Sequence, residues 1–392
     1  MKKTFFITVL ALLMGFGMIG SAGAEEGVTD TEIVIGSHQD LSGPAAAWGT
    51  QVKKGLEMRA REINEAGGIH GRKIRLVIED NAYDPKKAIM VTNKMIARDK
   101  VFAFICNMGS ATAGATKELI SKKKIPQMYP ISAASLFYDP YDRYSFGGAL
   151  PYYDQARSLV KYFVEQKGYT KIGLMYQDDD LGAPIKQGME DQLRVHNLPL
   201  VAVSYKRGAT DFSSQIGKLK KADVQFVVLG TSLRETVGAL KEARKINWKV
   251  DMGGTASSFS SFVIDLSLAA GFSPDGYYAV AVGPYVYPDS PLEKIRALCE
   301  KFKQWYGEYP QQQVRAGLTG ISFFAAFAEK VGRDLTREKW IDAAESYGVW
   351  KDEKFAGADI EFTPTNHQGG FDGILHQIQN NRFVKIADIS YR

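Results

Sequence analysis

The amino-acid sequence predicts an α/β protein with two doubly wound lobes, each a parallel sheet covered by helices. Apolar strands and amphipathic helices alternate along the chain, and this alternating array restarts once. The predicted strands are apolar on both faces, as a parallel sheet between two helical layers requires. The chain has 392 residues, which exceeds the usual size of a single hydrophobic core, so two domains are expected.

The first array follows the N-terminal region. Strands are predicted over residues 32–39, 73–80 and 101–106, from the segments EIVIGSHQ, KIRLVIED and VFAFIC. A helix over Thr50–Ala66 separates the first two strands, because its apolar residues recur on one face. A second helix is predicted over residues 83–100, with Asp84 as N-cap and Pro85 at the first helical position.

The second array has strands predicted over residues 171–177, 200–205 and 224–230. Helices follow each of them, over residues 180–196, after Asp211 and from Leu233 onward. The C-terminal third contains long helical stretches, residues 291–310 and 314–332, and a strand over residues 381–389. None of these segments forms a full alternating array, so we expect them to be added to the two existing lobes and not to form a third domain.

Residues 1–24 have the layout of a secretory signal peptide. Lys2 and Lys3 precede an apolar stretch over Phe5–Ile19, and small residues end at a cleavage site near Ala24. A membrane anchor is the alternative, but the apolar stretch is short for a membrane span. The sequence therefore predicts a soluble, exported protein.

Composition and spacing disfavour several classes of site. The formal net charge is +5, and basic residues alternate with acidic ones, so no nucleic-acid partner is expected. The two cysteines, Cys106 and Cys299, form no CxxC motif, and Cys106 ends an apolar strand, as a buried thiol would. His367 and His376 lack a third ligand in register, and the acidic run 178–180 lacks the spacing of a calcium loop. No metal or cofactor is predicted.

Three strand-to-helix connections are rich in small and polar residues. They are DLSGPAAAWG (residues 40–49), NMGSATAGATKELI (107–120) and LGTSLRETV (229–237). In open parallel sheets, ligands bind beyond the carboxyl ends of the strands. Helix entrances there favour an anionic group, because their N–H groups and dipoles attract negative charge. Nucleotide-binding fingerprints such as GxGxxG and GxxxxGK[ST] are absent.

The chain resembles the leucine/isoleucine/valine-binding protein family. The resemblance is carried by these connections and by the segments INEAGGIHGRKIRLVIEDNAYDP and MGSATAGATKELISKKKIPQMYPISAAS, and it is strongest over Glu32–Ser135. The family consists of periplasmic substrate-binding proteins of ABC transporters with the type I two-lobed fold. The resemblance implies a three-stranded hinge near Leu150, Val282 and Ala356. Lobe 1 would then comprise residues 25–150 and 283–356, and lobe 2 residues 151–282 and 357–392.

The resemblance also implies where a ligand would bind. Ser110 matches the family's serine that holds the ligand carboxylate, although an ordinary helix N-cap is the alternative. Trp48 matches an aromatic lid, with ordinary packing as its alternative. The remaining implied contacts are Ile131, Ser132 and Ala133 in the first lobe, and Tyr152, Thr231 and Thr255 in the second.

Members that bind amino acids commonly place an acid where this chain has Thr255. Many members carry a tyrosine at the position of Thr231, and a residue with a side-chain hydroxyl is often found at the position of Ala133. A buried ammonium without a compensating acid is costly. The sequence therefore favours a small monocarboxylate with an apolar or aromatic body, and an aliphatic amino acid is the alternative. Asp251, Glu235 or the run 178–180 could still supply the missing charge.

The predicted function is that of an extracytoplasmic binding protein of a branched-chain-amino-acid-type ABC importer. It would capture a small carboxylate-bearing ligand between its lobes and deliver it to the membrane permease. A ligand-sensing protein of a signalling receptor is the alternative, and an exported enzyme is a weaker one. The sequence has no GxSxG, HExxH or catalytic-cysteine arrangement, so no enzymatic activity is expected.

Overall fold

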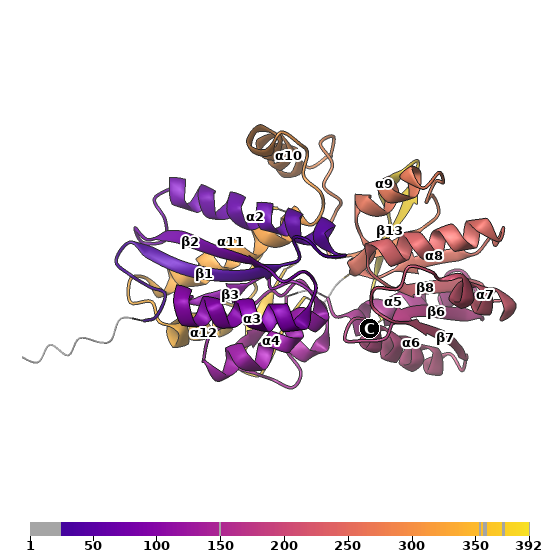
Figure 1. Ribbon diagram of the computed structural model, residues 1–392, viewed down its shortest axis with the longest axis horizontal. Helices are drawn as coiled ribbons and strands as arrows, with labels where there is room; N and C mark the ends of the chain where they lie inside the picture. The colour runs from indigo at the N-terminus through magenta and orange to yellow at the C-terminus, as the bar shows by residue number, and fades with distance from the viewer. Residues whose placement is uncertain (1–24, 149, 353, 356–358, 371–372, 392) are drawn as a thin grey trace, which may run out of the picture.

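The structure, a computed structural model, describes residues 25–148, 150–352, 354–355, 359–370 and 373–391. The predicted signal peptide and the predicted crossing at Ala356 lie outside the described residues. Two lobes lie side by side along the longest axis of the molecule, each with its own sheet (Figure 1). The predicted α/β class with two parallel-sheet lobes is confirmed.

The first lobe is built on a five-stranded parallel sheet in the order β2-β1-β3-β4-β5. Residues of β1 are buried on both faces, as expected for a strand between helical layers. The elements are β1 (Glu32–Gln39), α2 (Ala46–Glu65), β2 (Lys73–Asp80), α3 (Pro85–Lys94), η1 (Met95–Asp99), β3 (Ala103–Ile105), α4 (Ser110–Lys122), β4 (Gln127–Met128), η2 (Ser135–Phe137) and β5 (Ser145–Phe146).

The second lobe is built on a seven-stranded sheet in the order β14-β13-β10-β9-β8-β6-β7. Strands β6 to β10 are parallel, whereas β13 and β14 add an antiparallel edge. The elements are α5 (Tyr152–Glu165), β6 (Ile172–Gln177), α6 (Gly182–Val195), β7 (Leu200–Tyr205), α7 (Ser213–Lys221), β8 (Phe226–Gly230), α8 (Leu233–Lys245), β9 (Asp251–Gly254), η3 (Ala256–Ser258), α9 (Ser261–Ala269), β10 (Tyr278–Ala281), β13 (Gly373–Gln379) and β14 (Arg382–Ile389).

Between β10 and β13 the chain returns to the first lobe as α10 (Glu293–Tyr306), α11 (Val314–Val331), α12 (Arg337–Glu345), β11 (Glu361–Thr363) and β12 (Asn366–Gly369). Helix α11 packs closely on α2 through glycines. A Cβ added to Gly317 would lie 2.3 Å from the carbonyl oxygen of Val52, so only glycine allows this approach. The first-lobe core is thereby completed by residues distant in sequence.

The chain crosses between the lobes after β5, after β10 and between β12 and β13. The hairpin β11–β12 packs on the first lobe, with the Phe362 ring 5.1 Å from that of Phe146. A Cβ on Gly369 would lie 2.6 Å from the Cα of Gly148, so the first and third crossings touch. These contacts favour a third crossing between Gly369 and Gly373. The exact lobe boundaries, including the one expected at residues 356 and 357, stay a prediction.

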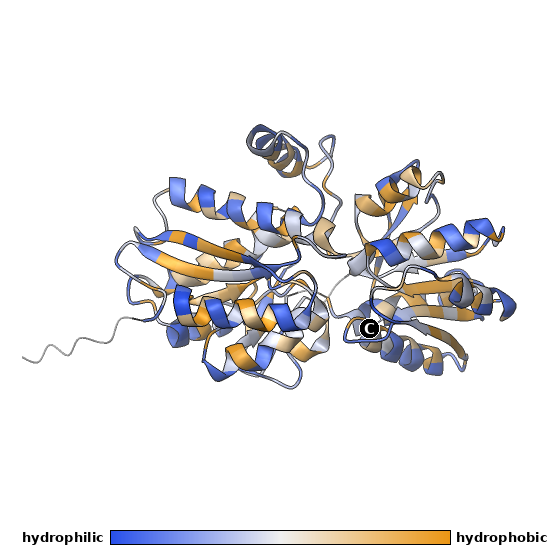
Figure 2. Ribbon diagram, in the orientation of Figure 1, coloured by the Kyte–Doolittle hydropathy of each residue, from blue (hydrophilic) through white to orange (hydrophobic). Residues whose placement is uncertain are grey.

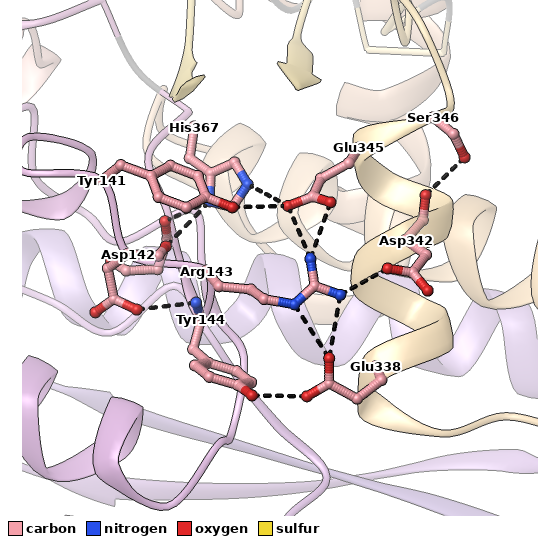
Figure 3. A network of polar contacts seen from close by, with 10 residues as sticks. Tyr141, Asp142, Arg143, Tyr144, Glu338, Asp342, Glu345, Ser346 and His367 are labelled. Atoms are coloured by element: carbon pink, nitrogen blue, oxygen red, sulfur yellow. Dashed lines mark hydrogen bonds and ion pairs between the residues drawn. The ribbon is translucent and has the colours of Figure 1, made fainter. Parts of the chain in front are cut away.

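A polar network fixes the first-lobe side of these crossings (Figure 3). Arg143 binds three carboxylates of α12, those of Glu338, Asp342 and Glu345, with nitrogen–oxygen distances of 3.1, 2.6 and 3.1 Å. Glu345 also lies 3.1 Å from Nε2 of His367 on β12. Helix α12, the loop before β5 and the hairpin β11–β12 are therefore tied together.

The helix predicted over Thr50–Ala66 begins four residues earlier, at Ala46. The cause is Asp40, whose carboxylate accepts hydrogen bonds from the backbone N–H groups of Gly43 and Ala45, at 2.5 and 2.7 Å. This turn starts the helix before Thr50 and places Trp48 within it. The N-cap predicted at Asp84 is confirmed, because its side chain accepts from the N–H groups of Lys86 and Lys87.

Apolar segments lie in the strands, and hydrophilic ones predominate on the outer faces of helices such as α2 and α8 (Figure 2). Among the residues that the structure describes, no helix is both long and apolar enough to cross a membrane. Cys106 and Cys299 are buried and unpaired, which agrees with the buried thiol predicted at Cys106. Burial raises the pKa of both thiols, so they are poor nucleophiles.

Candidate functional site

A cavity of about 140 Å³ lies between the two lobes. Its walls come from segments that follow the carboxyl ends of strands in both sheets, where ligands bind in open α/β folds. The wall residues are Ala45, Trp48, Tyr83, Met108, Gly109, Ser110, Tyr129, Pro130, Ile131, Ser132, Ala133, Tyr152, Leu181, Ser232, Ala256, Ser257, Val282 and Ala316.

Six of the eight residues singled out from the sequence lie in this wall. Trp48 and Tyr152 contribute aromatic rings, Ser110 and Ser132 contribute hydroxyls, and Ile131 and Ala133 complete the first-lobe side. Their contact with a ligand stays a prediction. The structure brings them together from α2, α4, α5 and the loop after β4.

Thr231 and Thr255 do not line the cavity. Both are fully buried, and their hydroxyls bond within the second lobe, to Thr236 Oγ1 at 2.6 Å and to Ser257 Oγ at 2.9 Å. The residues directly after them, Ser232 and Ala256, face the cavity instead. Each threonine hydroxyl is hydrogen-bonded at the end of its strand, and contact of either threonine with a ligand stays a prediction.

Two serine hydroxyls form a polar corner of the cavity at the amino end of α4. Ser110 Oγ lies 2.8 Å from Ser132 Oγ, and Ser132 Oγ accepts from the backbone N–H of Ala134 at 3.1 Å. Gly109, with φ of 95°, is the N-cap of α4, so Ser110 is not the cap. The Ser110 hydroxyl and the helix amino end together favour an anion at this corner.

Tyr152 closes the same corner from the second lobe. Burial raises the pKa of Tyr152 to about 12, although hydrogen bonds from the Ala133 backbone and the Ser110 side chain lower it in part. The phenol is therefore neutral and able to donate a hydrogen bond at any physiological pH. Its backbone N–H donates to the Ala133 carbonyl at 2.8 Å, which ties the start of α5 to the first lobe.

Trp48 spans the two lobes. Its ring packs against the hydrophobic cores of both, and its Nε1 donates to the carbonyl oxygen of Ser257 at 3.2 Å. The side chain therefore does more than fill space in the first lobe. It forms a wall of the cavity and a direct bond across it.

Tyr83 is a wall residue that the sequence analysis missed. Tyr83 and Ala82 both have positive φ, 57° and 49°, a conformation that costs a non-glycine residue about 1 kcal/mol or more. Asn81 holds the loop by accepting from the N–H of Tyr83 at 2.8 Å. Left-handed backbone at ordinary residues leaves no periodic signal in a sequence, so this projection of Tyr83 could not be predicted.

The cavity wall, as far as the structure describes it, contains no acidic or basic side chain. Asp251 binds the Tyr169 hydroxyl at 2.9 Å, at the opposite end of β9. Asp178 and Asp179 are paired with Lys206 and Arg207. None of these acids is among the wall residues.

Glu235, the other candidate acid, lies in the first turn of α8, behind Ser232. It is 7% exposed, burial raises its pKa, and it is not among the wall residues. Asp180 lines a different groove, between the η2 segment and the first turns of α5 and α6. No group of three or more histidine, cysteine or carboxylate side chains able to hold a metal occurs among the described residues.

The family described as periplasmic binding protein matches residues 32–382. The Leu/Ile/Val-binding protein of Escherichia coli strain K12 is 28% identical over 256 residues, covering 65% of this chain and 68% of that protein.

Two solved structures share the fold. A fatty acid ABC transporter substrate-binding protein from Thermomonospora curvata superimposes with a TM-score of 0.83 at 22% identity, over 94% of each chain. A solute-binding protein of an ABC transporter from R. palustris, in complex with benzoate, gives a TM-score of 0.79 at 18% identity, over 91% of this chain and 96% of that one.

Proposed function

This chain belongs to the periplasmic binding protein family, and from that membership we propose that it captures a small monocarboxylate between its lobes for an ABC importer. The resemblance to Leu/Ile/Val-binding proteins expected from the sequence is confirmed. The chain is of the branched-chain-amino-acid transport type, and its relatives are binding proteins. Export to the periplasm and delivery to a membrane permease are part of the proposal.

The observation that carries the proposed ligand is an uncharged, largely apolar cavity with four aromatic side chains in its wall and a polar corner at the amino end of α4. The corner formed by Ser110, Ser132 and the amino end of α4 suits a carboxylate. Trp48, Tyr83 and Tyr129 surround the remaining space, which suits an apolar or aromatic body. A zwitterion would bring an ammonium against walls without an acid, which costs several kcal/mol.

The ligands named for two similar structures support this chemistry. One of those proteins belongs to a fatty acid transporter and the other holds benzoate, and both ligands carry a carboxylate without an ammonium. An aliphatic amino acid is the second candidate, favoured by the curated relatives, which are Leu/Ile/Val-binding proteins. The two candidates differ only in the α-ammonium.

Matched pairs of acids test the proposal. Leucine is compared with 4-methylpentanoate and phenylalanine with 3-phenylpropanoate, with benzoate as a fifth probe, by thermal shift and then by calorimetry. We expect the deaminated acids to bind and to raise the melting temperature by mass action. The amide 4-methylpentanamide is the control that lacks the carboxylate charge.

Tight binding of leucine without a response to 4-methylpentanoate would overturn the proposed ligand class and favour the second candidate. Incubation of the purified protein with each probe, followed by mass spectrometry, tests the binding role itself. The probes should be recovered unchanged, whereas conversion of any of them would favour the enzyme alternative.

A further inference from the structure

Tyr83 reaches the cavity from a loop that is held in a demanding conformation. Asn81, which is fully buried, accepts from the N–H of Tyr83 and directs its own amide toward His38 Nδ1, at 2.8 Å, and the Met108 carbonyl, at 3.1 Å. A Cβ on Gly109 would lie 2.8 Å from Cε2 of Tyr83. The ring therefore packs against the backbone at the polar corner, and the first lobe holds the loop backbone that carries it.

The second lobe contributes a cation to the same ring. The guanidinium carbon of Arg207, in the loop after β7, lies 5.4 Å from the centre of the Tyr83 ring. This is the range of a cation–π contact. Tyr83 follows β2 and Arg207 follows β7, so the contact joins the two lobes at the cavity.

Arg207 is itself held in place. Its Nε and one terminal nitrogen both bind Asp179 Oδ2, the former at 3.1 Å. Asp179 accepts further hydrogen bonds from Gln177 Nε2 at 2.7 Å and from the backbone N–H of Leu181 at 3.0 Å. Leu181 is a wall residue. The Arg207 side chain, 28% exposed, is thus hydrogen-bonded to a strand-end turn of the second lobe.

We propose that Arg207 is a positioning residue that holds the Tyr83 ring against the ligand, and that the pair determines how long an apolar ligand is retained. This inference rests on the proposed function, because it assigns a role within the same cavity. Tyr83 is placed in contact with the ligand, and Arg207 acts through it. Since the partners belong to different lobes, their contact exists only when the lobes are closed.

The kinetic consequence follows from that placement. A contact made only in the closed state slows reopening, so its loss is expected to raise the dissociation rate more than it lowers the association rate. A ligand that fills the cavity up to Tyr83 benefits, whereas a ligand too small to touch the ring does not. The pair therefore favours larger apolar bodies.

Variants of Arg207 test the positioning role, with 3-phenylpropanoate as the larger probe and benzoate as the smaller one. Arg207→Ala should weaken binding of 3-phenylpropanoate about tenfold, mainly through faster dissociation in stopped-flow measurements. Arg207→Lys keeps a cation over the ring but loses the two-pronged bond to Asp179, so it should restore binding to within about threefold of wild type.

Lys206→Ala is the matched control, because Lys206 adjoins Arg207 and forms a similar ion pair, with Asp178 at 2.5 Å, but its side chain is 85% exposed. It should bind both probes as wild type does. Equal affinities and dissociation rates for Arg207→Ala and Lys206→Ala would overturn the proposal. A double-mutant cycle with Tyr83→Leu should show that the Arg207 effect disappears once the ring is gone.

A distance measurement tests the pair without relying on any one ligand. Spin labels at Lys123→Cys, after α4, and Lys218→Cys, on α7, report the separation of the lobes, since both lysines are exposed and the native thiols are buried. Arg207→Ala should shift the distance distribution toward longer, open separations relative to wild type, with and without 4-methylpentanoate. An unchanged distribution in both conditions would contradict the proposal.

Failure of the proposed ligand class and failure of the proposed role of Arg207 give different results. If wild-type protein binds none of the five probes, the proposed ligand class fails, and the distance distributions alone decide the role of Arg207. If the probes bind but Arg207 variants match Lys206→Ala in rates and distances, the ligand class stands and the positioning role is overturned.

Discussion

Trp48 Nε1 donates a hydrogen bond to the main-chain carbonyl of Ser257, 3.2 Å away in the other lobe. One side chain thus forms a wall of the cavity and joins its two halves. Because the acceptor is a backbone atom, the bond depends on the position of η3 and not on the identity of the Ser257 side chain. The indole therefore joins the two lobes at a position where ligand contact is predicted.

Replacement of Trp48 should therefore affect binding more than folding. Trp48→Phe keeps an aromatic wall but loses the donor, so we expect affinity to fall by about 1 kcal/mol. Trp48→Ala also removes the apolar surface and should cost about 2–3 kcal/mol of binding. Calorimetry with 4-methylpentanoate measures both. Trp248→Phe is the control, since Trp248 lies at the far end of the second lobe, and wild-type affinity in both Trp48 variants would remove this residue from the site.

Alanine variants of Ser110 and Thr336 should distinguish a loss of ligand binding from a loss of helix capping. Thr336 caps α12 by accepting from the N–H of Lys339, so Thr336→Ala should cost about 0.5–2 kcal/mol of stability and leave binding unchanged. Gly109, not Ser110, caps α4. Ser110→Ala should therefore lose about 1–2 kcal/mol of binding with a smaller change in melting temperature. The opposite pattern would identify Ser110 as a structural residue only.

Glu62 should stabilise the first lobe in a pH-dependent way. Burial raises its pKa, but hydrogen bonds from Lys301, Lys354 and Arg59 outweigh that effect and lower it from 4.5 to about 2. Because the folded pKa lies below the unfolded one, the stabilisation is present above pH 4.5 and is lost as pH falls toward 2. Allowing for solvent screening, it amounts to about 1–2 kcal/mol.

Glu62→Gln should lower the melting temperature at pH 7 and flatten its decline between pH 4.5 and 2. Glu65→Gln is the control on the same helix, because Glu65 and its partner Arg61 are both more than half exposed. Equal melting curves for the two variants across this pH range would show that the cluster around Glu62 contributes nothing.

His38 should make the stability of the protein fall with acid at a higher pH than Glu62 does. It is fully buried, and burial lowers its pKa from 6.5 to about 3, with a backbone hydrogen bond opposing in part. The neutral ring is therefore favoured in the folded state. The stabilisation is complete above pH 6.5 and declines as pH falls toward 3, by roughly 5 kcal/mol in all.

The contacts of His38 extend this effect to the cavity. Asn81 bonds its Nδ1 and also holds the N–H of Tyr83. His38→Gln should remove the decline in melting temperature between pH 6.5 and 4. It should also weaken ligand binding at pH 7. His196→Gln, at a partly buried outer position, serves as the control. An unaltered acid limb in His38→Gln would contradict the assignment.

The sequence predicted the two arrays of strands and helices well, because buried parallel strands are continuous apolar runs and helices such as α3 carry clear caps. It also located six wall residues, since the connections after parallel strands converge on one edge. It misplaced the start of α2, where Asp40 and not Thr50 organises the turn. That effect depends on tertiary contacts that no local pattern records.

Two features of the site lay beyond sequence reasoning for different reasons. Thr231 and Thr255 were assigned to the wall, but a shift of one residue at a strand end reverses which side chain faces the cavity. Tyr83 and Arg207 come from separate lobes, and their contact arises only when the lobes meet. Neither spacing nor composition predicts contacts across an interface of this kind.

The return of the chain to the first lobe has a consequence for how the protein folds. Phe146, from the early part of the chain, packs its ring against Trp340 and Phe362, which are synthesised some two hundred residues later. Contacts of such long sequence separation slow folding. The early segment therefore cannot finish a core of its own as it emerges from the ribosome, and nearly the whole chain must be available before the first lobe becomes stable.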